Sequence, residues 1–189
     1  MKNPMRLRVA IVAYPGAGKD TVGRMLAEEH SFDFISTSDH IQALITERGL
    51  GDTSLENMNK FSTEFRTEFG ADFPTAQILR DSRDVERLAL GGLRTLAEAK
   101  TFKFQRGVIL VVDAPAPRRY QYALGRGRLG DRKSFDEFLA FEKMEASNTD
   151  PLKHNVNAII RLADVKIDND GTLNDLQRKV ADFVWRLES

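Results

Sequence analysis

The sequence has 189 residues, of which 41% are hydrophobic, so it is long enough to bury one well-formed core. Its 28 Lys and Arg residues balance its 28 Asp and Glu residues, and this zero net charge does not favour a nucleic-acid scaffold, which typically has a dominant basic field. The lack of cysteine excludes disulfide bonds and thiolate metal sites, in keeping with a cytoplasmic protein. The basic N-terminus leads into an apolar run, residues 9–14, that is too short for a signal peptide, and no stretch is long enough for a membrane span.

Apolar and amphipathic runs alternate along the sequence, and each predicts one element of secondary structure. Short runs predict strands over residues 7–13, 32–37, 86–92, 107–115 and 163–170. Longer runs predict helices over residues 20–30, 38–49, 55–69, 118–125, 134–147 and 172–187, with a further helix that opens at residue 95. Because strands and helices alternate, we expect a parallel α/β sheet in a single domain, residues 1–189.

Polar residues mark where several of these helices begin. Residues 95–98 (TLAE) and 134–137 (SFDE) have the spacing of a capping box. Ser38 or Asp39 is expected to be the N-cap of the second helix, which ends at Gly49. The regularly spaced phenylalanines of the third helix are expected to pack into a core rather than to bind a cofactor.

The sequence AYPGAGKDT, residues 13–21, lies between the first predicted strand and the first predicted helix. Phosphate oxygens need several converging backbone N–H groups at the positive end of a helix. Gly16 and Gly18 allow close backbone approach with positive φ, and Lys19 supplies a charge for the β- and γ-phosphates. Ala13 stands where the first glycine of the usual pattern is expected, and an ordinary strand–turn–helix corner is the alternative interpretation.

Asp20 follows Lys19 at the position where the usual pattern has Ser or Thr. A bare carboxylate beside a triphosphate is repelled, but a cation between them reverses the sign of the interaction. Mg²⁺ prefers carboxylate, water and phosphate oxygens. We therefore expect Asp20 to help hold Mg²⁺, directly or through a water, with Thr21 supplying a hydroxyl one position late. The alternative is that Asp20 only caps the helix or faces solvent.

At this point the sequence resembles the P-loop nucleoside- and nucleotide-kinase family, and within it the dephospho-CoA-kinase-like, adenylate-kinase-like and deoxynucleoside-monophosphate-kinase-like proteins. The loop at 13–21 is specific by itself, and further similar segments follow in the same order at residues 34–45, 64–79, 91–102, 108–128 and 163–180. The resemblance implies a three-layer P-loop NTPase fold, with a five-stranded parallel sheet and helices on both faces. It also implies an acceptor-binding insertion at about 38–83, a lid at about 125–133, ATP as phosphoryl donor and Mg²⁺ as cofactor.

The same resemblance implies roles for a set of polar and loop residues. The ATP-binding set is Pro15, Gly16, Ala17, Gly18, Lys19, Asp20, Thr21 and Arg132, and the metal-binding set is Asp20 and Thr21. The acceptor-binding set is Asp39, Gln42, Arg66, Arg80 and Arg94. The catalytic set is Lys19, Asp39, Arg126 and Arg128, because phosphoryl transfer needs positioning and positive charge.

Some of these residues have a simpler alternative role. Asp39 either accepts a proton from an acceptor hydroxyl or holds a metal-bound water, or it is a plain N-cap. The arginines of the glycine-rich loop at 125–134 either close over the γ-phosphate or form a solvated basic loop. Asp113 is expected to cap the turn before Pro115.

Two positions depart from the pattern of the family. Gln42 replaces the arginine that binds the phosphate of the acceptor in the relatives. Gly91 replaces the aspartate that supports Mg²⁺ or the P-loop there. Candidate replacements are Asp20 and Asp39 for the metal charge and Arg66, Arg80 and Arg83 for the phosphate clamp.

These features favour an ATP-dependent phosphotransferase that acts on a nucleotide-sized phosphorylated acceptor, above all a (deoxy)nucleoside monophosphate. A dephospho-CoA-type kinase and a non-catalytic or NTP-hydrolysing nucleotide-binding protein are the alternatives. We expect small-molecule nucleotide substrates as partners, no DNA or RNA scaffold role, no membrane, and a monomer or homodimer. His30, His40 and His154 fit no metal-ligand spacing, so surface or packing roles are expected for them.

Overall fold

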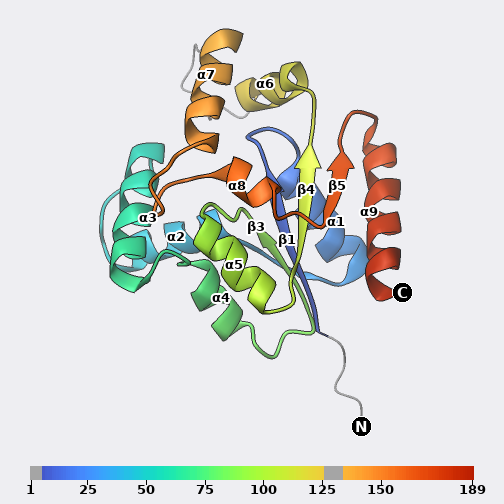
Figure 1. Cartoon of the computed structure of the whole chain (residues 1–189), viewed down its shortest axis with the longest axis horizontal. Helices are drawn as coiled ribbons and strands as arrows, with labels where there is room; N and C mark the ends of the chain where they lie inside the picture. The colour runs from blue at the N-terminus through green and yellow to red at the C-terminus, as the bar shows by residue number, and fades with distance from the viewer. Residues whose placement is uncertain (1–5, 126–133) are drawn as a thin grey trace.

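The computed structural model describes residues 6–125 and 134–189, and one parallel sheet lies at its centre (Figure 1). Its strands are β1 (Leu7–Ala13), β2 (Asp33–Ser36), β3 (Arg87–Gly91), β4 (Val108–Asp113) and β5 (Val165–Asp168). They lie in the order β2-β3-β1-β4-β5, and every neighbouring pair is parallel. Each observed strand falls within its predicted range.

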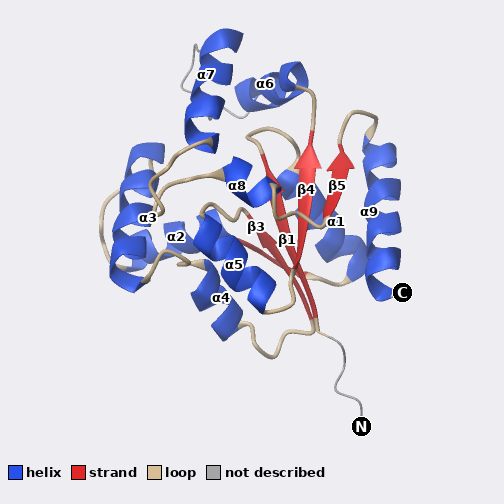
Figure 2. Ribbon diagram, in the orientation of Figure 1, coloured by secondary structure: helices blue, strands red, loops and turns tan. Residues whose placement is uncertain are grey.

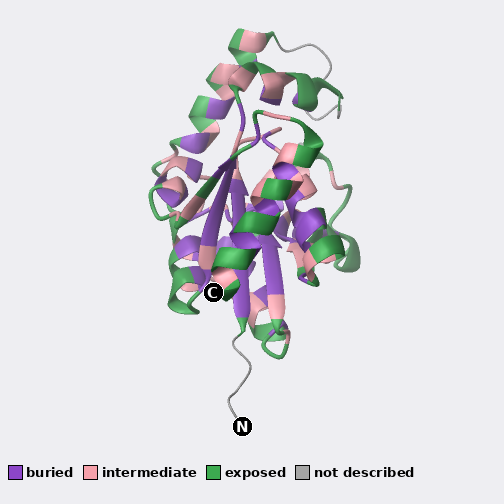
Figure 3. Ribbon diagram, turned by 90° about the vertical axis from the view of Figure 1, so that its right-hand side faces the viewer, coloured by how far each residue is buried: buried purple, intermediate pink, exposed green. Residues whose placement is uncertain are grey.

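Helices cover both faces of this sheet, which confirms the predicted three-layer fold (Figure 2). One face carries α1 (Lys19–His30) and α9 (Leu173–Glu188), and the other carries α5 (Leu96–Phe104) and α8 (Val156–Ile160). Val9 and Ile11 of β1 pack in the first core, and Ala10 between them packs in the second. The three inner strands β1, β3 and β4 are therefore buried on both sides (Figure 3), which is why their sequences are largely apolar rather than alternating, whereas the edge strand β5 alternates between half-buried or buried and exposed residues.

A helical segment between β2 and β3 has a small core of its own. It consists of α2 (Thr37–Glu47), α3 (Leu55–Phe69) and α4 (Thr75–Asp81). Phe61 and Phe65 of α3 are buried against Ile45 of α2 and against Phe73, so these two members of the predicted aromatic stripe are core residues. Phe69, at the end of the same stripe, is exposed.

Two further helices lie beyond the C-terminal ends of β4 and β5, at the top of Figure 1. They are α6 (Ala116–Gly125) and α7 (Phe135–Ala146). The guanidinium of Arg119 on α6 donates to Glu142 on α7 at 2.6 Å and to Asp113 at the end of β4 at 3.3 Å. These ion pairs attach the helix pair to the edge of the sheet at which a ligand is expected.

The helix starts differ from the predictions at two places. The N-cap of α2 is Ser36, whose hydroxyl accepts a hydrogen bond from the Asp39 N–H at 3.4 Å. The prediction of Ser38 or Asp39 as this N-cap is therefore wrong, because β2 continues into α2 without a connecting loop. Helix α6 begins at Ala116 rather than residue 118, since proline is compatible with the first turn of a helix.

Other caps agree with the sequence. The predicted capping box at 134–137 is confirmed, with both of its hydrogen bonds present. Thr95 caps α5, but the carboxylate of Glu98 is bound elsewhere, so the predicted box at 95–98 is only half formed.

Helices α4 and α8 were not predicted, because with seven and five residues they are too short to show a period. None of the helices in residues 6–125 and 134–189 has both the length and the hydropathy that a bilayer crossing requires.

Candidate phosphate-binding site

The turn between β1 and α1 has the geometry of a phosphate-binding loop. Gly16 and Gly18 adopt positive φ values of 80° and 107°, and Gly18 is the N-cap of α1. Helix α1 therefore presents its first backbone N–H groups and its positive end to a ligand at the loop. Packing behind the loop also requires glycine, because a Cβ on Gly16 would lie 2.3 Å from the carbonyl oxygen of Arg119.

Asn169, which follows β5, holds the loop from behind. Its side-chain amide donates to the carbonyl of Ala17 at 2.9 Å, and its backbone N–H donates to the carbonyl of Asp113 at 2.6 Å. A Cβ on Gly18 would lie 2.6 Å from the same amide nitrogen. The sequence analysis missed Asn169, because a single polar residue after a strand does not reveal what it contacts.

Lys19 and Asp20, the first two residues of α1, form an ion pair with each other. Their side chains are only 18% and 24% exposed, so the carboxylate of Asp20 lies beside the ammonium group of Lys19 instead of extending into solvent. The N-cap of this helix is Gly18, which places Asp20 in the first turn, where the helix dipole stabilises a negative charge.

Asp20 and Thr21 fit a Mg²⁺ ion that is bound chiefly by phosphate and water. Within the two described ranges, no group of three or more His, Asp or Glu side chains is placed to hold a metal on its own. Mg²⁺ usually keeps several waters and takes one or two carboxylates together with substrate phosphates. Asp20 supplies one such carboxylate at a helix N-terminus that suits phosphate.

Side chains from three segments converge on Gly92, directly after β3. A Cβ on this glycine would lie 3.1 Å from Thr37 Oγ1, 3.7 Å from Lys19 Cε and 3.8 Å from Arg94 Nε. The hydroxyl of Thr37 lies 2.8 Å from the carbonyl oxygen of Gly92. Lys19 and Arg94 therefore bring two positive charges to one place at the C-terminal edge of the sheet. The role of Arg94 toward an acceptor stays a prediction.

Arg94 is a half-buried cation whose guanidinium makes no hydrogen bond or ion pair with any residue that the structure describes. Burial lowers its pKa, while the carboxylates of Glu145 and Glu98 oppose this effect. Asp20 acts in the same direction as these two carboxylates, to a smaller extent. A desolvated guanidinium with unused donors is suited to bind an oxyanion.

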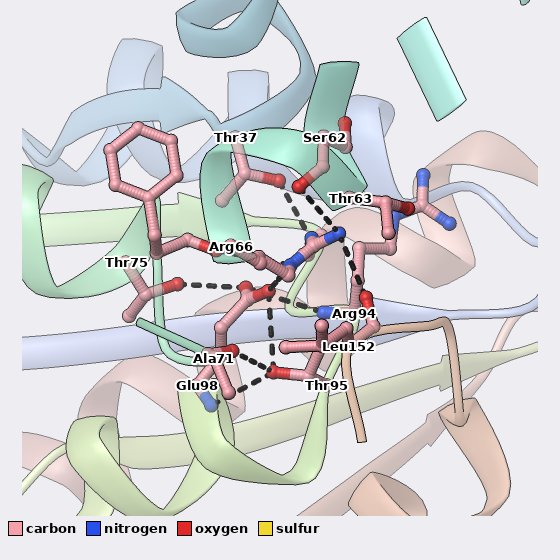
Figure 4. A network of polar contacts seen from close by, with 12 residues as sticks. Thr37, Ser62, Thr63, Arg66, Ala71, Thr75, Arg94, Thr95, Glu98 and Leu152 are labelled. Carbon is pink, nitrogen blue, oxygen red and sulfur yellow. Dashed lines mark hydrogen bonds and ion pairs between the residues drawn. The ribbon is translucent and has the colours of Figure 1, made fainter. Parts of the chain in front are cut away.

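Arg66 lies in a buried polar network and does not join Lys19 and Arg94 at Gly92 (Figure 4). It is 3% exposed and pairs with the fully buried Glu98 at 2.9 Å. Thr75 donates to the second oxygen of Glu98 at 2.9 Å, and the N–H of Arg94 lies 3.4 Å from the same oxygen. Burial raises the pKa of Glu98, and the charge of Arg66 opposes this. The network therefore occupies Arg66 and helps to position Arg94.

Two predicted acceptor residues, Asp39 and Gln42, lie on α2. This helix starts at the same edge of the sheet as the loop, because β2 and β1 run in the same direction. Both side chains are exposed, and the amide of Gln42 lies 3.4 Å from Thr53 Oγ1. Their roles toward an acceptor stay predictions.

Arg80 does not join this group of residues. It is exposed in the last turn of α4, and the carbonyl of Ser82 at the end of that helix lies 3.4 Å from Arg8 Nη2. Arg8 is the second residue of β1. Helix α4 therefore ends at the N-terminal edge of the sheet, opposite the loop. Arg83 is in the same region, 3.4 Å from Asp84. The expectation that Arg80 or Arg83 replaces the phosphate clamp is therefore corrected.

The remaining predicted residues belong to the end of β4 and the chain after it. Arg126, Arg128 and Arg132 lie outside the described residues. Asp113 accepts from the N–H of Ala114 at 2.9 Å, which confirms its structural role in this turn. The sequence analysis missed Arg118 on α6. The pKa of Asp170, in the loop after β5, is lowered mainly by its hydrogen bond with Lys179, and the charge of Arg118 adds a smaller effect in the same direction.

Residues 12–134 match the model of a protein family described as "AAA domain". This part of the chain contains the loop, Gly92 and Arg94. The chain belongs to this AAA domain family. The predicted relationship to P-loop kinases is thereby confirmed.

Relatives of this AAA domain protein extend over nearly its whole length. A UPF0200 protein of Aeropyrum pernix is 30% identical over 178 residues, which cover 94% of this chain and 91% of that protein. A UPF0200 protein of Thermococcus sibiricus is 28% identical over 187 residues, covering 95% and 94%. Among solved structures, the shikimate kinase of Acinetobacter baumannii in complex with shikimate has a TM-score of 0.59 at 21% identity, with 96% and 95% of the chains covered. This last likeness shows that the fold is that of a P-loop kinase.

Proposed function

We propose that the protein is an ATP-dependent kinase that transfers a phosphoryl group to a nucleotide-sized phosphorylated acceptor, with a (deoxy)nucleoside monophosphate as the favoured class. The observation that carries this proposal is the convergence of Lys19 and Arg94 on Gly92. Lys19 belongs to the phosphate loop after β1, and Arg94 follows the neighbouring parallel strand β3 at the same edge of the sheet. Two cations at one point are what a transfer between two phosphate-bearing molecules requires.

The donor is assigned to residues 15–21. Backbone N–H groups of the loop and the N-terminus of α1 would bind the phosphates of ATP, and Lys19 would contact the β- and γ-phosphates. Asp20 and Thr21 would hold Mg²⁺, which supplies positive charge against the triphosphate when it is bound. Arg118, whose charge acts on Asp170 in the loop after β5, is assigned to the far end of the donor.

The acceptor is assigned to the opposite side of Gly92. Arg94 would bind its phosphate, because its guanidinium has donors that no described residue uses. Thr37, which touches the carbonyl oxygens of Gly91 and Gly92, fixes the start of α2 beside this position. Asp39 and Gln42, one and two turns along the same helix, are assigned to the body of the acceptor.

A nucleotide-binding protein without transfer activity, or one that hydrolyses NTP, is the second candidate. It is favoured by the glycine at position 91 and by the ion pair that already engages Lys19 and Asp20. A dephospho-CoA-type kinase differs from the favoured function only in the acceptor.

An ADP-release screen tests these alternatives. ATP and Mg²⁺ are supplied with nucleoside monophosphates, dephospho-CoA and shikimate in turn. A kinase for a phosphorylated acceptor releases ADP with one of the first two classes and not with shikimate, whereas an NTPase releases it with no acceptor. Lys19→Ala should abolish release and weaken ATP binding by about 2–5 kcal/mol, as expected for a lost charge contact in a desolvated site. Lys100→Ala, an exposed lysine on α5, is the matched control.

A further inference from the structure

The connection between α7 and α8 brings a histidine to the acceptor side of the site. The Nδ1 atom of His154 lies 3.5 Å from Glu145 Oε2, and the side chains are only 18% and 25% exposed. The N–H of Asn155, the next residue, donates to the carbonyl of Arg94 at 2.8 Å. The backbone of the segment that carries His154 is therefore held against the backbone of Arg94, and the partly buried His154 side chain is neither a surface residue nor part of the apolar core.

A second contact fixes the same connection to the buried network. Arg66 Nη1 lies 3.5 Å from the carbonyl oxygen of Leu152, as Figure 4 shows. Three elements thus supply the charges that act on His154: Glu145 comes from α7, Arg94 from the turn after β3 and Arg66 from α3. The segment that carries the histidine is anchored to two of these three residues.

These surroundings favour the neutral form of the imidazole in the protein without ligand. Burial lowers the pKa of His154 most strongly, and the cations Arg94 and Arg66 act in the same direction. The carboxylate of Glu145 opposes them, and its own pKa is lowered by its hydrogen bond with His154. An anion that binds to Arg94 cancels part of the positive charge that keeps His154 neutral.

We propose that Arg94 and His154, with Glu145 as a positioning residue, form a proton-coupled binding site for a doubly charged phosphate monoester group. The proposal rests on the proposed function, because it describes the acceptor subsite of the same proposed site. When the dianion binds, one proton moves from solvent to the imidazole, and no bond of the acceptor breaks. The bound dianion therefore meets two positive charges, those of Arg94 and protonated His154. Without the dianion, His154 is neutral and only the charge of Arg94 remains. This arrangement selects a phosphate monoester over a neutral nucleoside or a carboxylate.

Inorganic sulfate is a suitable probe, because its charge does not change between about pH 5 and pH 8, where histidine titrates. The chain has three histidines, so the imidazole signals can be followed by NMR and assigned with His154→Gln. We expect sulfate to raise the titration midpoint of His154 in the wild type and to leave the midpoint in folded Arg94→Ala unchanged. The signals of His30 and His40 are internal controls. Glu145→Gln should lower the midpoint in the absence of sulfate.

A second measurement does not depend on Arg94→Ala being folded. By linkage, sulfate affinity of the wild type should fall as pH rises, by about tenfold for each unit by which sulfate raises the pKa of His154. His154→Gln should remove this dependence. A His154 midpoint that does not respond to saturating sulfate would overturn the proposal, as would a shift that persists in folded Arg94→Ala or an unchanged pH dependence in His154→Gln. Neither readout needs ATP, so failure of the ADP-release screen with a positive sulfate result rejects the kinase and keeps the anion site.

Discussion

The ring of Phe34 on β2 occupies the space beside Gly91 at the end of β3. A Cβ on Gly91 would lie 2.9 Å from two ring atoms of Phe34 and 3.2 Å from Lys19 Nζ. The same ring also packs on Gly23 of α1, where a Cβ would lie 2.3 Å from it. The position at which nucleotide kinases that this sequence resembles have an aspartate is therefore filled by an aromatic ring. The nearest carboxylate to Lys19 in the described chain comes instead from Asp20, its own neighbour.

Gly91→Asp should destabilise the protein, because the new side chain has no room beside Phe34. Inserting atoms into a packed position typically costs about 1–3 kcal/mol. The free energy of unfolding, measured by denaturant titration, should fall by that amount. Gly125→Asp at the end of α6 is the control, since a Cβ there would meet nothing within 4 Å. Equal stabilities of Gly91→Asp and the wild type would show that Phe34 moves aside without cost.

The positions of the five strands along the chain and the position of the loop could be predicted from the sequence because they depend on local patterns. A buried parallel strand is apolar throughout, and a phosphate loop needs its glycines and lysine at fixed spacing. Arg94 could be placed for a similar reason: it follows a strand, and the C-terminal ends of parallel strands lie at one edge of the sheet.

The partners of individual side chains could not be predicted in this way. Arg66 and Arg94 look alike in the sequence, yet one is neutralised by a buried carboxylate 32 positions away and the other is not. Arg80 is excluded from the site only because the short α4 runs to the opposite edge of the sheet. His154 was expected to be a surface or packing residue, since its relation to Arg94 depends on how the connection before α8 folds back.

Glu98→Gln should cost about 3–5 kcal/mol in the free energy of unfolding, because it leaves the buried charge of Arg66 without a counter-charge. Chemical denaturation at neutral pH measures this loss. The double variant Arg66→Met with Glu98→Gln should recover a large part of it, because no buried charge remains. Glu68→Gln, which breaks an exposed pair with Arg48, is the control and should change stability by about 0–1 kcal/mol. If Glu98→Gln costs no more than this control, Glu98 is already neutral in the folded protein.

Asp175 should make the free energy of unfolding depend on pH in the acidic range. It accepts hydrogen bonds from the N–H and hydroxyl of Thr172 at the start of α9, and these bonds lower its pKa from 3.8 to about 2. A lowered folded-state pKa stabilises the protein above the unfolded pKa, and this contribution is lost as pH falls from about 4 to about 2. Asp175→Asn should flatten the free energy of unfolding against pH over that window. The neutral neighbouring change Asn174→Ala should keep the wild-type slope, and an identical slope in Asp175→Asn would contradict the assignment.

Because Lys19 and Asp20 form an ion pair, we expect Asp20 to have opposite effects on ATP binding with and without metal. Without Mg²⁺, the carboxylate competes with phosphate for Lys19 and repels the triphosphate. With Mg²⁺ bound as proposed, the same carboxylate would help hold the ion, and Lys19 would be available to the phosphates. The side chain of Asp20 is therefore expected to hinder ATP binding without Mg²⁺ and to support ATP binding with Mg²⁺.

Asp20→Asn should weaken ATP–Mg²⁺ binding by about 1.5–3 kcal/mol, the contribution of one contact to a charged group, and should reduce turnover. It should leave metal-free ATP binding equal or slightly tighter, because a repulsion has been removed. Isothermal titration calorimetry in Mg²⁺ and in EDTA measures both affinities on the same samples. Asp20→Ser restores the hydroxyl of the usual loop and should keep part of the activity. If Asp20 serves only the helix, Asp20→Asn lowers helix stability by about 0.3–1 kcal/mol through the lost charge in the first turn, and neither ATP affinity changes. An Asn variant with wild-type affinity in Mg²⁺ would therefore move the search for the metal ligand to Thr21 or Asp39.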